Sequence, residues 1–245
     1  MAASVQTATV WNDVARGAAG ERHHAALQGR AATRAPVPDP LDLLEQFGAT
    51  LVVPREAEIH GQDDPAEYCY RILRGCVRTA RLTEDGRRQV VEFLLPGDVL
   101  GFAAIGTHDF AAQAVSPVTL RRYPRRMVEA LAERNAGLAR RLREIVAQDL
   151  RGAYDRIMLL GRKTATERLA SLLLEMAARL PQGPQGRIEL PMNRTDMADH
   201  LGLTIETVSR MLALLKRGGT IAIARSGLQI RDRAVLQQLA SGLRQ

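Results

Sequence analysis

Residues 191–218 read PMNRTDMADHLGLTIETVSRMLALLKRG, and their apolar residues form two short helical patterns separated by a glycine. In the first pattern, Met197, Ala198 and Leu201 recur at the intervals of a packed helix face. Gly202 follows at a position that must turn sharply, a conformation that glycine adopts without steric cost. Thr204 then precedes the second pattern, where threonine is a good helix N-cap. This stretch therefore predicts two helices joined by a tight turn.

The second of these helices has one apolar and one polar face. We expect its buried face to consist of Ile205, Val208, Leu212 and Leu215. Glu206, Ser209 and Arg210 lie three and four residues apart and so share another face near the N-terminus. The pattern is that of a helix-turn-helix, in which the start of the second helix reaches base edges in the major groove. An ordinary helical hairpin with a solvated polar side has the same spacing and remains open.

The side chains on this polar face have the hydrogen-bonding groups that base edges require. Arginine matches the paired acceptors of guanine, glutamate accepts from the amino group of cytosine, and serine can bond either way. Residues around them can contact phosphates, which position a protein on DNA without specifying sequence. The candidate DNA-binding residues are Glu206, Ser209, Arg210, Thr204, Thr207, Arg194 and Lys216.

The charge distribution supports a polyanionic partner for the same half of the chain. The 245 residues carry a net charge of +7, with 46% hydrophobic and 25% charged residues, as in ordinary globular proteins of one or two domains. Residues 1–120 hold 11 basic and 15 acidic side chains, whereas residues 121–245 hold 23 and 12. The basic excess thus lies in the half that contains the helix-turn-helix, although a membrane surface would attract it too.

Several classes of protein do not fit the sequence. Two cysteines are too few for a disulfide framework, and no apolar run approaches the ~20 residues of a membrane span. No signal-like segment begins the chain, so we expect a soluble, cytoplasmic protein with reduced thiols. We find no nucleophile elbow, phosphate-binding glycine loop or zinc signature, and therefore expect no enzyme.

The residue composition of the N-terminal half changes near its prolines. Residues 1–38 are rich in Ala, Gly and Arg and end in APVPDP, which predicts a flexible tail. Residues 41–47 predict a short helix with Leu43, Leu44 and Phe47 inward. Short β-rich runs follow between turns such as Asp85-Gly86, at the spacing of a small β-barrel. Residues 39–124 are therefore expected to form a β-domain.

Residues 125–162 predict a long helix with one weak point at 135–137. An apolar stripe with alternating four- and three-residue spacing, typical of a coiled-coil seam, predicts a parallel homodimer. A helix that packs only on its own barrel would also show an apolar stripe, and Leu138, Leu142 and Ile145 could provide one. The expected dimer seam is Val146, Leu150, Ala153, Ile157 and Leu160.

Residues 163–245 read as a winged helix-turn-helix domain. Thr164 and Glu167 have the spacing of a capping box that opens a helix over 165–180. A strand at 187–191 precedes the helix-turn-helix, and a β-hairpin around Ser226-Gly227 and a helix over 234–243 follow it. The hairpin is the wing of such a domain, and its candidate phosphate contacts are Arg225, Arg231 and Arg233.

Three motifs make the chain resemble the Crp/Fnr superfamily of bacterial transcription regulators. They are YRILRGCVRTARLTEDGRRQVVEFLLPGDVLGF at 70–102, RKTATERLASLLL at 162–174 and LPMNRTDMADHLGLTIETVSRMLALLKRGG at 190–219. The resemblance covers residues from about 41 to 240 and implies an α+β fold: a β-roll of the cyclic-nucleotide-binding type, a dimer helix and a winged helix-turn-helix. The E-x-x-S-R triplet, here Glu206, Ser209 and Arg210, resembles the Fnr and FixK branch. That likeness implies an inverted repeat of TTGA-type half-sites, RNA polymerase as a partner of an activator, and genes of low-oxygen or nitrogen-oxide metabolism.

The resemblance is weakest where family members bind their signals. Cyclic-nucleotide members have an Arg-Ser pair where this chain has Asp109-Phe110, which disfavours a phosphate. The iron–sulfur members carry N-terminal cysteines, and this chain has none before Cys69, so one subunit cannot assemble a four-thiolate cluster. We therefore expect a FixK-like regulator without cofactor or metal, whose seam residue Ala153 favours a dimer without a signal. A haem- or small-ligand-dependent gas sensor of the same superfamily remains an alternative, with Cys69, Cys76, His60 and His108 as candidate haem ligands. Oxidation of the Cys76 thiol is a further alternative.

Overall fold

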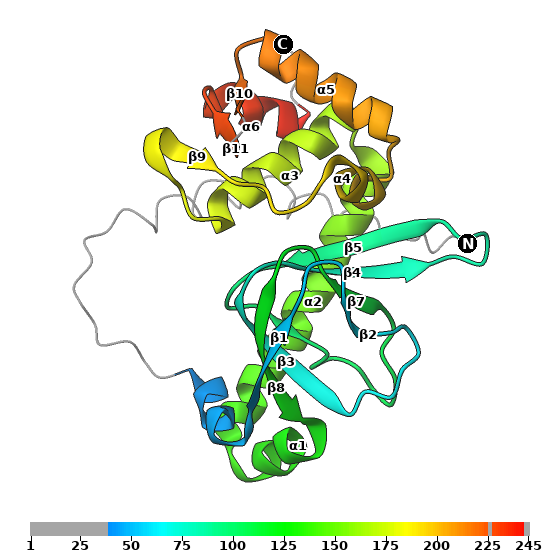
Figure 1. Cartoon of the computed structure of the whole chain (residues 1–245), viewed down its shortest axis with the longest axis vertical. Helices are drawn as coiled ribbons and strands as arrows, with labels where there is room; N and C mark the ends of the chain where they lie inside the picture. Colours follow the sequence, from blue (N-terminus) through cyan, green and yellow to red (C-terminus); the bar gives the residue numbers. More distant parts are fainter. Residues whose placement is uncertain (1–38, 225–226, 243–245) are drawn as a thin grey trace, which may run out of the picture. The chain divides into compact units, whose positions relative to one another are not determined.

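The computed structural model describes residues 39–224 and 227–242. The predicted tail over 1–38 and the wing-tip residue Arg225 lie outside these described residues. Two antiparallel four-stranded sheets form the β-domain, in the orders β1-β8-β3-β6 and β2-β7-β4-β5 (Figure 1). Their strands are β1 (Ala49–Val53), β2 (Glu58–His60), β3 (Tyr68–Arg74), β4 (Val77–Leu82), β5 (Arg88–Leu94), β6 (Val99–Leu100), β7 (Ala111–Ala114) and β8 (Val118–Pro124).

The two sheets enclose an apolar core that the sequence pattern largely anticipates. Ile72, Val77, Val118 and Leu120 are buried there, and each comes from one of the predicted β-rich runs. The short strands β2, β6 and β7 were not predicted, because two to four residues are too few to show alternation. The predicted Asp85-Gly86 turn is confirmed: it joins β4 to β5, whose register pairs Leu82 with Arg88.

The short helix before β1 differs in type from the prediction. Residues Pro40–Phe47 form a 3₁₀ helix, η2, in which Leu41 and Leu44 are buried. Three residues per turn place these two on the same face. The expected inward positions of Leu43 and Phe47 are wrong, because both side chains remain exposed.

The predicted long helix is two helices. Helix α1 (Arg125–Arg134) ends at Asn135, and α2 (Ala136–Arg162) begins there, with the Asn135 side chain accepting a hydrogen bond from the Leu138 amide. The weak point at 135–137 is thus a real break, since an asparagine in extended conformation caps the second helix. Leu138 and Ile145 are buried against η2 and β8, as predicted for the face of α2 that packs on its own β-domain.

The C-terminal part consists of helices around a small sheet. Thr164 and Glu167 form the predicted capping box at the start of α3 (Ala165–Arg179). A 3₁₀ turn, η3 (Pro184–Gly186), leads into β9 (Arg187–Ile188), which pairs with the hairpin of β10 (Ile221–Ala224) and β11 (Gly227–Ile230). Helix α6 (Arg233–Ser241) packs against α3. The predicted strand over 187–191 is shortened to two residues.

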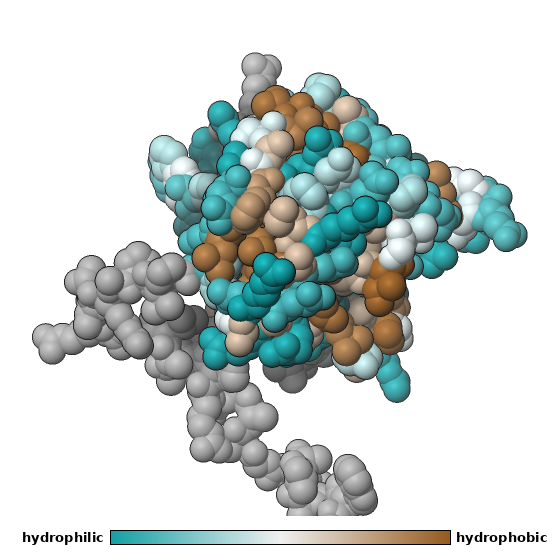
Figure 2. Space-filling view, turned by 90° about the horizontal axis from the view of Figure 1, so that it is seen from below, coloured by the Kyte–Doolittle hydropathy of each residue, from teal (hydrophilic) through white to brown (hydrophobic). Residues whose placement is uncertain are grey.

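Figure 2 shows the face of the described residues that lies at the bottom of Figure 1. Seen from below in Figure 2, hydrophobic residues form several separate patches between hydrophilic ones. No helix within residues 39–224 and 227–242 is long and apolar enough to cross a membrane.

Candidate nucleic-acid interface

Helices α4 (Arg194–Leu201) and α5 (Ile205–Arg217) form the predicted helix-turn-helix. Asn193 and Asp196 make a capping box at the start of α4. Gly202 ends the helix in the left-handed conformation, with φ of 61°, where a side chain would be strained. The Thr204 hydroxyl accepts a hydrogen bond from the Thr207 amide at 3.2 Å and so caps α5. The turn and both helix starts are therefore encoded locally.

Helix α5 packs on α3 and α4 through one face. Val208, Leu212 and Leu215 are buried, as predicted. Ile205 is not: it is 42% exposed, although its spacing placed it on the apolar face. It occupies the first position of α5, directly after the turn.

The opposite face of α5 presents the candidate base-reading residues to solvent. Glu206 and Arg210 are exposed, and Ser209 is partly exposed between them. Hydrogen bonds from its own backbone amide and from the Thr204 hydroxyl lower the pKa of Glu206, so this carboxylate is ionised at neutral pH. The structure thus brings together a carboxylate, a hydroxyl and a guanidinium on one exposed face at a helix N-terminus.

Arg194 connects the two helices beside this face. Its Nη1 donates a hydrogen bond to Ser209 Oγ at 3.2 Å. Because that oxygen accepts from Arg194, the Ser209 hydroxyl proton can be donated elsewhere. Lys216 lies ten residues beyond Glu206, about 15 Å further along the helix axis at 1.5 Å per residue. Lys216 is therefore separate from the base-reading face, close to the C-terminal end of α5.

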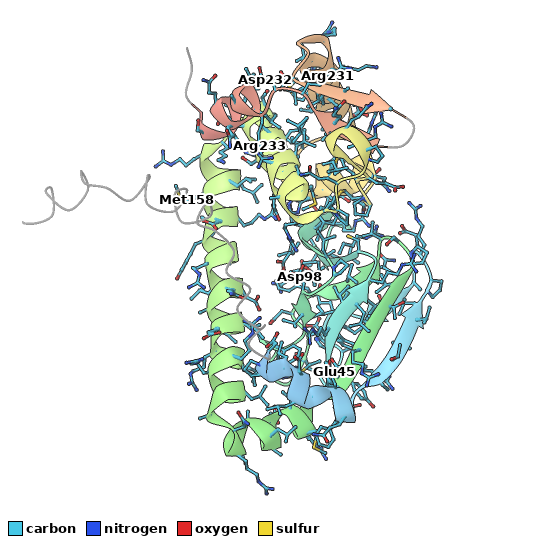
Figure 3. The ribbon with its side chains drawn as sticks, turned by 90° about the vertical axis from the view of Figure 1, so that its left-hand side faces the viewer. Glu45, Asp98, Met158, Arg231, Asp232 and Arg233 are labelled. Atoms are coloured by element: carbon cyan, nitrogen blue, oxygen red, sulfur yellow. The ribbon has the colours of Figure 1, made fainter. Side chains whose placement is uncertain are left out.

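The predicted wing contacts Arg231 and Arg233 lie just beyond the hairpin: Arg231 follows β11, and Arg233 is the first residue of α6. Arg231 and Arg233 are exposed on either side of Asp232, whose carboxylate accepts from the Val235 amide and caps α6. Figure 3 shows these three residues together at the end of the C-terminal part, where the hairpin passes into α6. The backbone amide of Arg231 donates to the Thr220 carbonyl, which continues the pairing of β10 with β11 beyond Ile221 and Ile230.

The candidate seam residues lie on a side of α2 that its own chain leaves uncovered. Val146, Leu150 and Ile157 are 47%, 52% and 64% exposed, and Ala153 is exposed as well. Tyr154 and Met158, which the sequence reading did not include, are exposed beside them, and Met158 projects from the side of α2 opposite the β-domain (Figure 3). Leu160 differs, being partly buried close to Gly202 of its own chain.

Sequence reasoning missed Arg168, an arginine that holds the C-terminal helices in place. Arg168 of α3 donates to the carbonyls of Leu160 and Lys163 at the end of α2, and to that of Leu201 at the end of α4. One guanidinium therefore joins two helix C-termini, where unpaired carbonyls need donors. Nothing in the sequence distinguishes it from a solvated helix arginine, because its partners come from two other elements.

The residues considered for a cofactor do not form a metal-binding group. Cys69 and Cys76 are buried, and burial raises the pKa of their thiols to about 11 and about 12, so neither is a thiolate at neutral pH. The rings of His60 and His108 stack at 3.6 Å, and burial lowers the pKa of His108 to about 4. Among the described residues, no three His, Cys, Asp or Glu side chains converge as metal ligands. With only two cysteines in the sequence, the chain also does not fit a four-thiolate iron–sulfur cluster.

Comparison with known proteins agrees with this geometry. Residues 167–239 match the Crp-like helix-turn-helix domain, and residues 50–135 match the cyclic nucleotide-binding domain. The nitrogen fixation regulation protein FixK of Bradyrhizobium diazoefficiens is 40% identical over 75% of this chain and 78% of its own length. FixK of Azorhizobium caulinodans is 37% identical over 94% of this chain and 89% of its own. The solved structure of FixK2 from Bradyrhizobium japonicum has a TM-score of 0.75 and 41% identity, and covers 78% of this chain and 96% of that chain.

Proposed function

The chain belongs to the Crp/Fnr family of DNA-binding transcription regulators, and on this basis we propose that it binds an inverted repeat of TTGA-type half-sites as a homodimer and activates transcription there. It is thus a regulator rather than an enzyme. The observation that carries the proposal is the exposed triplet of Glu206, Ser209 and Arg210 on the capped start of α5. As an activator acting in the cytoplasm, it would have RNA polymerase as a further partner.

Each residue of the triplet has a role in the proposed base reading. Arg210 pairs with the guanine of the half-site, because a guanidinium matches its two major-groove acceptors. Glu206, ionised and exposed, accepts from a cytosine amino group on the complementary strand. Ser209 already accepts a hydrogen bond from Arg194, so its hydroxyl donates to a base acceptor. Arg194 therefore orients a reading residue as well as contributing positive charge.

The surrounding residues position the helix on the phosphate backbone. Thr204 and Thr207 lie at the helix start, where hydroxyls and backbone amides can approach a phosphate. Lys216, Arg231 after the wing and Arg233 at the start of α6 reach the backbone further along the site. We assign DNA reading to residues 163–245, dimerisation to 125–162 and a sensor-like structural role to 39–124.

The exposed stripe on α2 is the proposed dimer interface. A parallel pair of α2 helices would cover Val146, Leu150, Ala153 and Ile157, with Tyr154 and Met158 broadening the contact. A twofold axis places the two recognition helices about one DNA turn apart, ~34–36 Å, as an inverted repeat requires. Ala153, being apolar, allows this pairing without a signal.

We further propose that the regulator acts without a bound cofactor and that its abundance sets its activity. The buried, protonated thiols do not supply the thiolates that an iron–sulfur cluster needs, and the Asp109-Phe110 sequence offers no partner to a cyclic-nucleotide phosphate. Relatives are named for nitrogen fixation regulation and for fumarate and nitrate reduction. Genes of low-oxygen or nitrogen-oxide metabolism are the corresponding targets for this chain.

Binding to DNA of defined sequence tests the proposal. The purified protein should bind an inverted TTGA repeat at least about 100-fold more tightly than a scrambled repeat, since each good base pair contact contributes ~1–3 kcal/mol. Arg210→Ala should lose most of that preference, whereas Arg81→Ala, which removes an exposed arginine from the β-domain, should keep it. Equal binding of both DNAs by the unaltered protein would refute base reading by α5. An absorption band of haem or of an iron–sulfur cluster in the purified protein would refute the cofactor-free mode.

A further inference from the structure

A buried arginine of the β-domain contacts the helix-turn-helix directly. Arg78 on β4 is only 3% exposed. Its Nη1 donates to Asp196 Oδ1 of α4 at 2.9 Å, and its Nη2 donates to Glu56 and to Gln113 at 2.6 Å each. Every hydrogen bond of this guanidinium thus goes to a side chain that is either acidic or an amide, and one of them belongs to the DNA-binding part.

The neighbouring strand makes a second set of contacts to the same helix. Arg88 on β5 donates to Asp196 Oδ1 at 2.9 Å and lies 2.7 Å from Asp199 Oδ2. Gln89 donates to the Asp199 carbonyl at 2.6 Å. The hairpin of β4 and β5 runs beneath α4 in Figure 1, consistent with the packing of α4 on β5.

Asp196 occupies a special position in α4. It is 1% exposed, and its other oxygen accepts from the Asn193 amide in the capping box. The same carboxylate therefore closes the first turn of the helix and joins it to two arginines of the β-domain. Removing one of these arginines while Asp196 stays buried would leave its carboxylate poorly compensated, which is strongly destabilising. We name Arg78, Arg88, Asp196 and Asp199 the hairpin–α4 cluster.

The proposed dimer helix α2 also contacts the hairpin and α4. Arg156 of α2 donates to the Val91 carbonyl of β5 at 2.7 Å and to the His200 carbonyl of α4 at 3.0 Å. Arg156 directly precedes Ile157 of the proposed seam. Arg156 therefore links three elements: the proposed dimer helix α2, the β4–β5 hairpin and α4, the first helix of the helix-turn-helix.

We propose that the hairpin–α4 cluster positions the two recognition helices of the dimer relative to each other, and so makes the protein specific for one spacing between half-sites. Arg78 and Arg88 are positioning residues: they touch no base, but α4 packs on α5, and fixing α4 to the hairpin fixes α5 with respect to α2. This inference rests on the proposed dimeric binding of an inverted repeat. It assigns to the β-domain a role in DNA recognition that needs no ligand.

The test measures affinity against spacing. Inverted repeats are prepared with the separation between half-sites unchanged or changed by one or two base pairs, which moves one site by ~3.4 Å and about a tenth of a turn per base pair. The unaltered protein should prefer one spacing by at least about tenfold, or 1.4 kcal/mol. Arg78→Met and Arg88→Met should reduce that preference to about threefold or less while binding a single half-site with unchanged affinity.

Matched variants separate positioning from folding. Arg87→Met removes an arginine of the same hairpin whose ion-pair partner is Asp85 of the turn, so it should keep the full spacing preference. Arg88→Lys retains the charge and should keep most of it. Arg88 is partly exposed, so its substitution provides a folded variant even if Arg78→Met unfolds, which circular dichroism detects.

The outcomes distinguish this inference from the function on which it rests. If the unaltered protein shows no preference for the TTGA repeat, the proposed function fails. If it prefers the repeat and one spacing, but folded and dimeric Arg88→Met keeps the same spacing preference, the hairpin–α4 cluster does not position the helices and the inference is overturned.

Discussion

Replacing Ile157 by aspartate should dissociate the dimer. Ile157 is 64% exposed in the single chain and is the last of the four exposed residues of the proposed seam. Full burial of an isoleucine side chain contributes about 1.5–3 kcal/mol. Covering the exposed two-thirds in both chains therefore contributes about 2–4 kcal/mol to a dimer.

The aspartate removes this contribution and adds a further cost. Two carboxylates, one from each chain, would face each other in an apolar seam without a cationic partner, which costs several kcal/mol. A total loss of at least about 4 kcal/mol raises the dimer dissociation constant about 1,000-fold. The local helix should survive, because position 157 is already largely exposed in the monomer.

Sedimentation equilibrium measures the effect. The unaltered protein should sediment at twice its chain mass of 26.9 kDa, and Ile157→Asp should sediment at 26.9 kDa over the same concentrations. Gln148→Asp is the matched control: it introduces the same charge at an exposed position of α2 outside the stripe, and it should remain dimeric. An Ile157→Asp protein that stays dimeric, or an unaltered monomer that binds the inverted repeat with full affinity, would refute the seam.

Three further outcomes follow from the site and its surroundings. Lys216→Ala should weaken binding to all DNA sequences about equally and reduce the slope of log affinity against log salt by about one per contacting subunit, as titration at several salt concentrations would show. Burial, followed by the charge of Arg156, lowers the pKa of His200 from 6.5 to about 3. Between these pH values the imidazole is protonated in the unfolded chain and neutral in the folded chain. Stability from this group is present above pH 6.5 and is lost as the pH falls towards 3, by about 1.4 kcal/mol per pH unit, and urea unfolding should show a shallower decline for His200→Asn. Cys69 and Cys76 should react with iodoacetamide at neutral pH only after denaturation, because both thiols are buried and protonated; mass spectrometry showing rapid labelling of the folded protein would contradict this.

The helix-turn-helix could be predicted almost completely because each of its determinants is local. The predicted cap at Thr204, the left-handed turn at Gly202 and the apolar spacing of α5 all act within a few residues. The cap at Asn193 is local as well, although the sequence analysis did not predict it. The break at Asn135 was visible only as a weakness, since a cap and a tolerated helical asparagine look alike in sequence. Ile205 was placed wrongly because periodicity takes no account of where the supporting core ends.

By itself the sequence determined the order of β-domain, long helix and winged helix-turn-helix, the triplet on the recognition helix and the apolar stripe along α2. Each of these depends on side-chain spacing within one element, and spacing is a property of the chain. Only the tertiary structure decided that Arg78 and Arg88 meet Asp196, which lies more than 100 residues further along the chain. Ion pairs between elements carry no periodic signal, because their partners are brought together by packing of the whole fold.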